Sequence, residues 1–489
     1  MAGYWYDRLT ALDSSFLLLE KPHAPLHVAS TLTFEAEPLR TPEGGINAKL
    51  IRDNIAAEIH RIQRYRQKLQ WVPFSMRPVW VDDDRFRLDY HVRHTSLPKP
   101  GTDEQLRRLS ARIMEQPLDL TRPLWEMWIV EGLEGDRFAL ISKVHHCMID
   151  GVSGAELLKI ILSASPDVVE PKPARFFPRR APSGAQLMRD ESLRRLSLPL
   201  GLISDVRGFF REAEDRRREV ISHFRAAADM VGATMQMATP TPINQAVSPH
   251  RRFDWWTMDF SEIREVRRGL GGSVNDVVLA TVCGAVQRFL EHRQVSPSSV
   301  DFRVMAPVSV RRSEDQEALG NQVSAWLIDL PIGEIDPREQ LRQIQVQTNE
   351  LKRSRQAVGA TVLAAAAEWG SSTLLALGAR NVSRVLPCNL IVTNVPGPQM
   401  PLYMLGAKML ETFPLVPLVD NLGLGIALMS YNGKLCWGFN GDYDLVPDLE
   451  VFKGFICESF AALKEAAGAG PLRSPKEAEA PLQIVPHPA

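Results

Sequence analysis

Residues 143–154 read KVHHCMIDGVSG and place two adjacent histidines a few positions before an Asp-Gly pair. Two apolar runs precede them, LWEMWIVEG (124–132) and RFALISKVHH (137–146), separated by LEGD. This pattern predicts a β-hairpin with the histidines at the exit of its second strand. Neighbouring side chains on a strand point to opposite faces. We therefore expect one imidazole to face a cleft and the other to pack inside, so His145 and His146 do not share one metal.

The segment after the histidines predicts a turn followed by a capped helix. Ser153-Gly-Ala-Glu156 has the spacing of a capping box, and AELLKIIL (155–162) has the apolar spacing of a helix. Asp150 falls in the intervening loop. A strand end, a glycine-containing turn and a helix start are a common setting for functional residues. The alternative is an ordinary Asp-Gly turn beside one internally hydrogen-bonded histidine.

Length and composition exclude several classes of protein. A chain of 489 residues predicts two large domains or two fused halves. The net charge of -1 favours neither nucleic acid nor a strongly acidic partner. Five scattered cysteines without a Cys-x-x-Cys pair argue against a zinc site or a disulfide framework and favour a reducing cytoplasm. No secretory signal and no run of eighteen apolar residues is visible.

Two proline-rich stretches, 165–184 and 237–253, divide the sequence, because proline sustains neither a helix interior nor a central strand. The flanking parts, 1–164 and 254–465, each mix strand-like and helix-like patterns. We expect an α/β protein with two halves joined by a helical crossover linker, 165–253. The tail, 466–489, is rich in Ala, Pro and Glu, a composition typical of disorder.

The string HHCMIDG resembles the His-His-x-x-x-Asp-Gly signature of the chloramphenicol acetyltransferase-like superfamily. Other stretches look like the bacterial wax ester synthase/diacylglycerol acyltransferase family, in order over about residues 5–465. They are LTALDSSFLLLE with PLHVA (9–29), FRLDYHVRH (86–94), RPLWEMWIVEGL (122–133), GGSVNDVVLATV (271–282), APVSVRR (306–312), LGNQVSA (319–325), TNVPGP (393–398) and SYNGKLCWGF (430–439). Two departures are small: Cys147 replaces a usual Ala, and PLHV stands where PMHV is common.

The resemblance implies a fold and a set of site residues. The fold would be two chloramphenicol acetyltransferase-like subdomains with mixed sheets and flanking helices. His146 would be the general base, and Asp150 would hold the site together, with His145 and Gly151 completing the motif. Arg311 is the candidate partner of Asp150 from the other half. The substrate-binding elements would be Pro123-Leu124-Trp125 and Asn275-Asp276, although Trp125 also suits a core strand and Asp276 also suits a helix cap.

The implied activity is acyl-CoA-dependent O-acyl transfer to diacylglycerol, to a fatty alcohol, or to both. Acyl-CoA would be a substrate, so we expect no cofactor and no metal. The sequence has no Gly-x-Ser-x-Gly motif, which agrees with direct transfer by a histidine base. Cys147 would point away from His146 on a continuing strand and make a poor nucleophile. The alternatives are a carrier-dependent condensation domain that forms amides, and a catalytically silent lipid-binding relative.

Substrates this insoluble imply collection at a lipid surface. Segment 197–226 sets Leu202, Val206, Phe209, Phe210, Val220 and Phe224 beside Arg207, Arg211, Arg216, Arg217 and Arg218. An apolar face edged with arginine suits shallow insertion among anionic lipids. We therefore expect a cytoplasmic enzyme, peripherally associated with the inner membrane or with lipid droplets and other lipid inclusions. The alternative is a crossover helix packed on the two halves.

Overall fold

The computed structural model describes residues 3–73, 78–148, 156–168, 172, 175–194, 238–309, 323–353 and 388–468. Several sequence predictions concern residues outside this set. These are Asp150, Gly151, the capping residue Ser153, Arg311, the arginine-rich segment 197–226 and the tail beyond Gly468.

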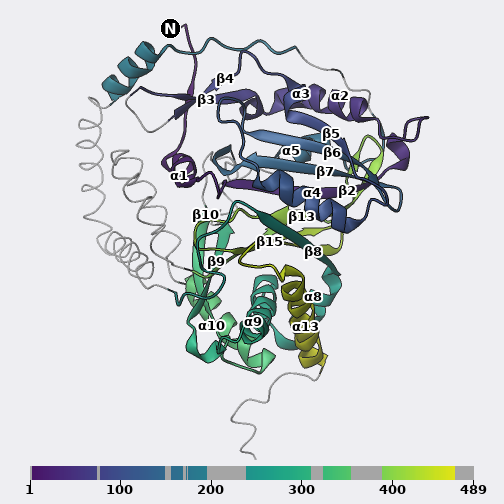
Figure 1. Cartoon of the computed structure of the whole chain (residues 1–489), viewed down its shortest axis with the longest axis vertical. Coiled ribbons are helices and arrows are strands. Elements are labelled where there is room, and N and C mark those ends of the chain that lie inside the picture. Colours follow the sequence, from purple (N-terminus) through teal and green to yellow (C-terminus); the bar gives the residue numbers. More distant parts are fainter. Residues whose placement is uncertain are drawn as a thin grey trace, which may run out of the picture.

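Two six-stranded sheets organise the described residues, one above the other in Figure 1. The first has the order β12 (Tyr403–Met404), β13 (Ala407–Leu415), β2 (His27–Glu35), β7 (Arg137–His145), β6 (Trp125–Leu133) and β5 (Val92–Ser96). The second has the order β10 (Val323–Leu330), β9 (Phe302–Ser309), β11 (Leu390–Pro396), β14 (Leu424–Tyr431), β15 (Lys434–Asp442) and β8 (Arg251–Asp259). Both sheets are mixed, since β5 runs parallel to β6 and β11 runs parallel to β9 and β14.

A third, small sheet and a set of helices complete the architecture. The small sheet contains β1 (Asp7–Arg8), β4 (Pro78–Asp82) and β3 (Gln67–Trp71). The first half carries the helices α1 (Ala11–Leu19), α2 (Ala48–Glu58), α3 (Leu88–His91), α4 (Asp103–Glu115) and α5 (Glu156–Ile161). The second half carries α8 (Phe260–Leu270), α9 (Val274–His292), α10 (Pro337–Arg353) and α13 (Leu449–Gly468). The observed mixture of sheets and helices agrees with the predicted α/β class.

The central strand β7 explains why the histidine-bearing run is apolar almost throughout. Its residues from Phe138 to His145 are all buried, because the strand is covered on both faces. One face joins a core that includes Leu140, Val144 and Trp125. The other face packs on α4 and, through Ile141, on side chains of the second half. The histidines therefore end a strand that the rest of the molecule holds rigidly.

The two halves share a core and a sheet. Trp255 of β8 stacks on Phe413 of β13 with ring centroids 4.5 Å apart, in the same cluster as Ile141 of β7. Strand β13 comes from the C-terminal part of the chain, yet it pairs antiparallel with β2 of the first half. In Figure 1 β8, β13 and β15 lie where the halves meet. The second half thus contributes backbone to the sheet that carries the histidines.

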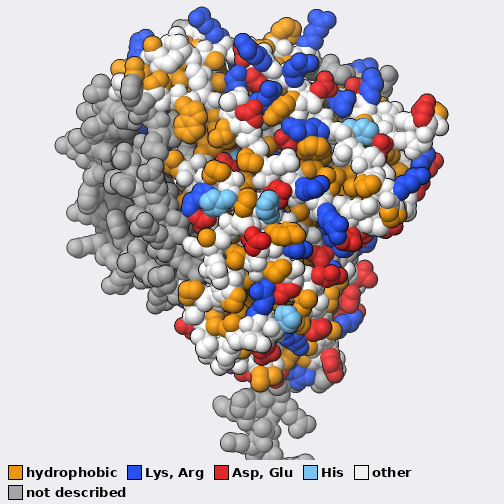
Figure 2. Space-filling model, in the orientation of Figure 1, with side chains coloured by type: hydrophobic (Ala, Val, Ile, Leu, Met, Phe, Trp, Pro, Cys, Tyr) orange, Lys and Arg blue, Asp and Glu red, His pale blue; other side chains and the backbone are white. Residues whose placement is uncertain are grey.

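Surface charge and helix length are the two features that relate to membrane contact. On the face shown in Figure 2, Lys and Arg side chains alternate with Asp and Glu, in keeping with a net charge of -1. Within the described ranges no single helix combines the length and hydropathy needed to cross a bilayer. Helices α8 and α9 meet that test only as a pair, bent by 93°.

Candidate active site

The two histidines occupy the exit of a hairpin, which confirms that sequence prediction. Strands β6 and β7 pair antiparallel, with Trp125 opposite Val144. His145 is the last residue of β7 and lies opposite His27 on β2. His146 begins the short 3-10 helix η4 (His146–Met148). The backbone therefore changes direction between the two rings.

His145 is the inward ring of the pair. It is fully buried, and its Nδ1 accepts a hydrogen bond from the Cys147 amide at 3.1 Å. A ring nitrogen that accepts a hydrogen bond carries no proton, which leaves Nε2 as the ring's donor. That nitrogen lies 3.4 Å from Glu20 Oε2, within ion-pair range but outside hydrogen-bond geometry. His145 thus binds the start of η4 and lies beside the carboxylate that follows α1.

His146 is the partly exposed ring. It stacks on Phe16 of α1, with ring centroids 3.9 Å apart. Burial lowers the pKa of His146 to about 4, so the imidazole is neutral at pH 7. Its Nδ1 is buried and has no hydrogen-bond partner in the described part of the chain. A neutral imidazole held against an aromatic ring at a strand end can accept a proton in a transition state.

Cys147 corrects one detail of the sequence analysis. The expectation that it points away from His146 assumed a continuing strand, but β7 ends at His145 and the chain turns into η4. Cys147 is 3% exposed, and burial, reinforced by the charge of Asp13, raises the pKa of its thiol well above the ordinary value. The thiol stays protonated at neutral pH and is a poor nucleophile for that reason.

The Pro123-Leu124-Trp125 element contacts the backbone of the histidine pair. All three residues are buried, and the Leu124 carbonyl accepts the His145 amide at 2.9 Å. Trp125 stacks on His91 with centroids 4.7 Å apart, and its Nε1 donates to the Tyr65 carbonyl at 2.8 Å. The Trp125 side chain is therefore part of the core. The substrate-binding role implied by the resemblance remains a prediction.

The Asn275-Asp276 element begins α9 in the second half. Asp276 is 3% exposed and forms a capping box with Ser273. Its Oδ2 accepts the Ser273 amide at 2.7 Å, and its Oδ1 accepts the Thr348 hydroxyl of α10 at 2.8 Å. Asn275 is exposed and accepts a hydrogen bond from Asn394 of the TNVPGP stretch at 2.7 Å. The structure thus joins two of the family-like stretches and shows the cap that the sequence allowed.

Sequence reasoning missed three residues beside the histidines, namely Phe16, Glu20 and His27. Glu20 Oε1 lies 3.5 Å from His27 Nε2, and the rings of His27 and His145 are 5.7 Å apart. Burial lowers the pKa of His27 well below its ordinary value. All three lie in the stretch 9–29, whose likeness to the family was the only available signal. No group of three or more His, Cys, Asp or Glu side chains suited to a metal occurs among the residues described.

Comparison with protein families gives two matches that together span most of the chain. The model described as the wax ester synthase/diacylglycerol acyltransferase catalytic domain matches residues 9–278. The model of the C-terminal domain of the same family matches residues 319–464. The first match alone covers more than half of the chain.

Individual relatives agree with these models. A Mycobacterium tuberculosis protein named as a diacylglycerol O-acyltransferase is 33% identical over 457 residues, covering 91% of this chain and 87% of its own length. A second M. tuberculosis protein with that name is 30% identical over 460 residues, covering 90% and 92%.

Solved structures confirm the fold. The wax ester synthase/diacylglycerol acyltransferase of Marinobacter aquaeolei VT8 superposes with a TM-score of 0.65 at 26% identity, covering 94% of this chain and 100% of that chain. The first condensation domain of the calcium-dependent antibiotic synthetase superposes with a TM-score of 0.60 at 15% identity, covering 95% and 97%. The second likeness concerns the fold alone.

Proposed function

The chain belongs to the wax ester synthase/diacylglycerol acyltransferase family, and we propose that His146 is the general base with which it transfers a long-chain acyl group from CoA to a hydroxyl. Family membership makes the protein an O-acyltransferase. The observation that carries the proposal for His146 is its setting. It is a neutral, largely buried imidazole that retains some exposure at the end of a rigid strand.

The proposed reaction has one proton donor and one leaving group. The hydroxyl passes its proton to His146 Nε2 while its oxygen attacks the thioester carbonyl carbon, and the C–S bond then breaks. The imidazolium returns the proton to the departing thiolate, which leaves an ester and free CoA. Nε2 is assigned this role because Nδ1 is the buried nitrogen. General-base help of this kind contributes about 10²–10⁴-fold.

No covalent enzyme intermediate is needed in this scheme. CoA thiolate is a good leaving group, and the Cys147 thiol next to the base stays protonated. Acyl-CoA enters as a substrate, so the proposal includes no cofactor. The remaining rate would come from holding donor and acceptor together, since proximity can supply about 7–11 kcal/mol of the barrier. Asp150, Gly151 and Arg311 keep the roles that the resemblance implies.

The acceptors follow from the names of the relatives. Diacylglycerol is the acceptor in the names of the mycobacterial proteins, and the Marinobacter protein is named for both activities. We therefore propose diacylglycerol, fatty alcohol or both as acceptors, with triacylglycerol or wax ester as product. Such substrates dissolve poorly in water, which supports an enzyme that works at a membrane or lipid-droplet surface, and we propose that this surface faces the cytoplasm.

A product assay tests the proposal. The purified protein is incubated with palmitoyl-CoA and either dipalmitoylglycerol or hexadecanol, and the lipids are separated by thin-layer chromatography. We expect a triacylglycerol band, a wax ester band or both, and neither with His146→Ala. Amide formation from an amine acceptor without ester formation would favour condensation chemistry. Lipid binding without any product would favour a silent relative, and either result would overturn the proposal.

A further inference from the structure

The loop at residues 20–26, between α1 and β2, lies directly against the histidine turn. The Leu26 carbonyl accepts the His146 amide at 2.9 Å. The Leu26 amide donates to Glu20 Oε1 at 3.2 Å, while Glu20 Oε2 faces His145 at 3.4 Å. The position of this loop therefore determines where both histidines stand.

A carboxylate of the second half holds the loop from one side. Asp420, between β13 and β14, pairs with Lys21 Nζ and lies 3.1 Å from His23 Nε2. Its side chain is 16% exposed. Burial alone would raise the pKa of Asp420, but the hydrogen bonds from Lys21 and His23 hold it below the ordinary value. The carboxylate is thus charged at neutral pH and anchored to two residues of the first half.

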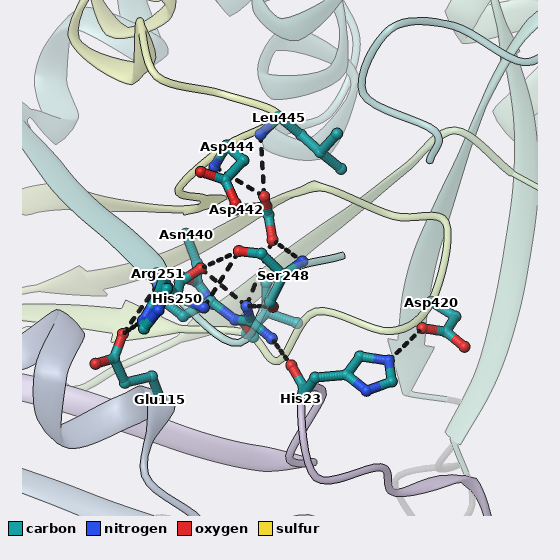
Figure 3. A network of polar contacts seen from close by, with 11 residues as sticks. His23, Glu115, Ser248, His250, Arg251, Asp420, Asn440, Asp442, Asp444 and Leu445 are labelled. Carbon is teal, nitrogen blue, oxygen red and sulfur yellow. Dashed lines mark hydrogen bonds and ion pairs between the residues drawn. The ribbon is translucent and has the colours of Figure 1, made fainter. Parts of the chain in front are cut away.

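A buried arginine at the start of β8, the edge strand of the second sheet, contacts the same loop from another side. Arg251, the first residue of β8, donates from Nη2 to the His23 carbonyl at 2.7 Å. Its Nη1 donates to the carbonyls of Ser248 and His250, and the fully buried Asp442 lies 3.6 Å away to balance the charge. Figure 3 shows Arg251 and Asp420 reaching His23 from different directions.

We propose that Asp420 and Arg251 are positioning residues through which the second half of the molecule sets the place of the catalytic histidine. The inference rests on the proposed role of His146 as the base. Asp420 and Arg251 contact the loop 20–26, and the Leu26 carbonyl of that loop accepts the His146 amide. A displacement of about 1 Å at a reacting group can lower the rate about 10²-fold. Loosening one of two anchors should therefore reduce turnover without removing any group that touches substrate.

The chain offers a matched control for Asp420. Asp448 also pairs with one cation and one histidine, Arg293 and His292, and its side chain is 19% exposed. Its pKa is likewise held below the ordinary value by Arg293, against the effect of burial. Both partners of Asp448 belong to the second half, so this cluster does not bridge the halves. Alanine at either position removes the contacts with one cation and one histidine, and at Asp448 it also removes the carboxylate that precedes α13, but only Asp420→Ala frees the loop.

The experiment compares kcat, KM and melting temperature for both variants. We expect Asp420→Ala to lower kcat about tenfold, with KM for acyl-CoA changed by less than about twofold, because the base moves while the donor site stays. Asp448→Ala should lower the melting temperature by a similar amount and leave kcat unchanged. Asp420→Asn keeps an acceptor for His23 and should recover part of the lost kcat.

Several outcomes would overturn the proposal. Equal kcat values for Asp420→Ala and Asp448→Ala would show that the loop does not depend on this anchor. A loss of rate in Asp420→Ala that only follows the loss of folded protein would show a structural role alone. His146→Ala, measured in parallel, separates this proposal from the function proposed above. If His146→Ala is inactive and Asp420→Ala keeps its kcat, only the positioning role is wrong.

Discussion

The turn after β7 and the first turn of α9 both place polar residues at the end of a regular element, but the hydrogen-bonding groups of these residues are satisfied to different degrees. At α9 both carboxylate oxygens of Asp276 accept hydrogen bonds, and Asn275 is bonded to Asn394. At β7 the buried His146 Nδ1 has no partner among the described residues. A buried polar atom without a partner costs about 1–3 kcal/mol. A protein can retain an unpartnered buried group where that group takes part in a reaction. A fully hydrogen-bonded network stabilises the fold instead.

The sharpest test of this difference is His146→Ala. We expect kcat to fall by about 10²–10⁴-fold while the melting temperature changes little, because the ring contributes a proton acceptor and few hydrogen bonds. His94→Ala is a surface control, since His94 is an exposed histidine of the same sheet. Retention of more than a tenth of the wild-type rate by His146→Ala would remove His146 as the base.

The pH dependence tests the same ring without mutation. The base must be neutral, and burial lowers the pKa of His146 to about 4. We expect kcat/KM to hold down to about pH 5 and to fall about tenfold per unit below pH 4, rather than below 6.5. An acid limb centred near pH 6.5 would show that the ring is solvated in the working enzyme.

Stability should follow pH in the same direction. His146 and His91 both have pKa values lowered by burial to about 4, against an ordinary value of 6.5. Between these values the unfolded chain binds more protons than the folded chain. Folding stability should therefore be lost as pH falls from about 6.5 to 4, and thermal melts across that window would measure it. Activity assays that end before the protein unfolds separate this loss of stability from the loss of activity caused by protonation of His146.

The α9 turn should respond in stability more than in rate. Asp276→Ala removes the carboxylate half of the capping box and the bond from Thr348, and we expect a loss of about 2 kcal/mol of unfolding free energy. Gln105→Ala, which breaks the capping box of α4, should lose about half as much. Denaturant unfolding measures both. A loss of activity above tenfold in folded Asp276→Ala would give that turn a role in the reaction.

The smallest effect is expected at Asn275. Its side chain is exposed, and its Oδ1 accepts a hydrogen bond from Asn394. Asn275→Ala should lose less than about 1 kcal/mol of stability and change kcat/KM less than about threefold. A large increase in KM for the acyl acceptor with unchanged stability would instead support the substrate-binding role implied by the resemblance.

Local pattern was enough to predict the hairpin and a helix cap at Asp276. The run 137–146 ends as a strand at His145, and Asp276 completes the capping box that begins α9. These features depend on neighbours within a few positions, so the order of residue types records them. The change of direction at His146 was not predicted, because a 3-10 turn of three residues has no periodicity to read.

The sequence by itself determined the family, the hairpin and the histidine pair, because each of these is written in contiguous residues. Only the tertiary structure decided which groups surround that pair. Phe16 reaches it from α1 and Glu20 from the loop that follows, and Asp420 and Arg251 hold that loop from positions some 230 to 400 residues further along the chain. Such contacts form when the second half inserts β13 beside β2 and buries a shared core. Local periodicity records that a side chain is buried, but not which distant side chain covers it.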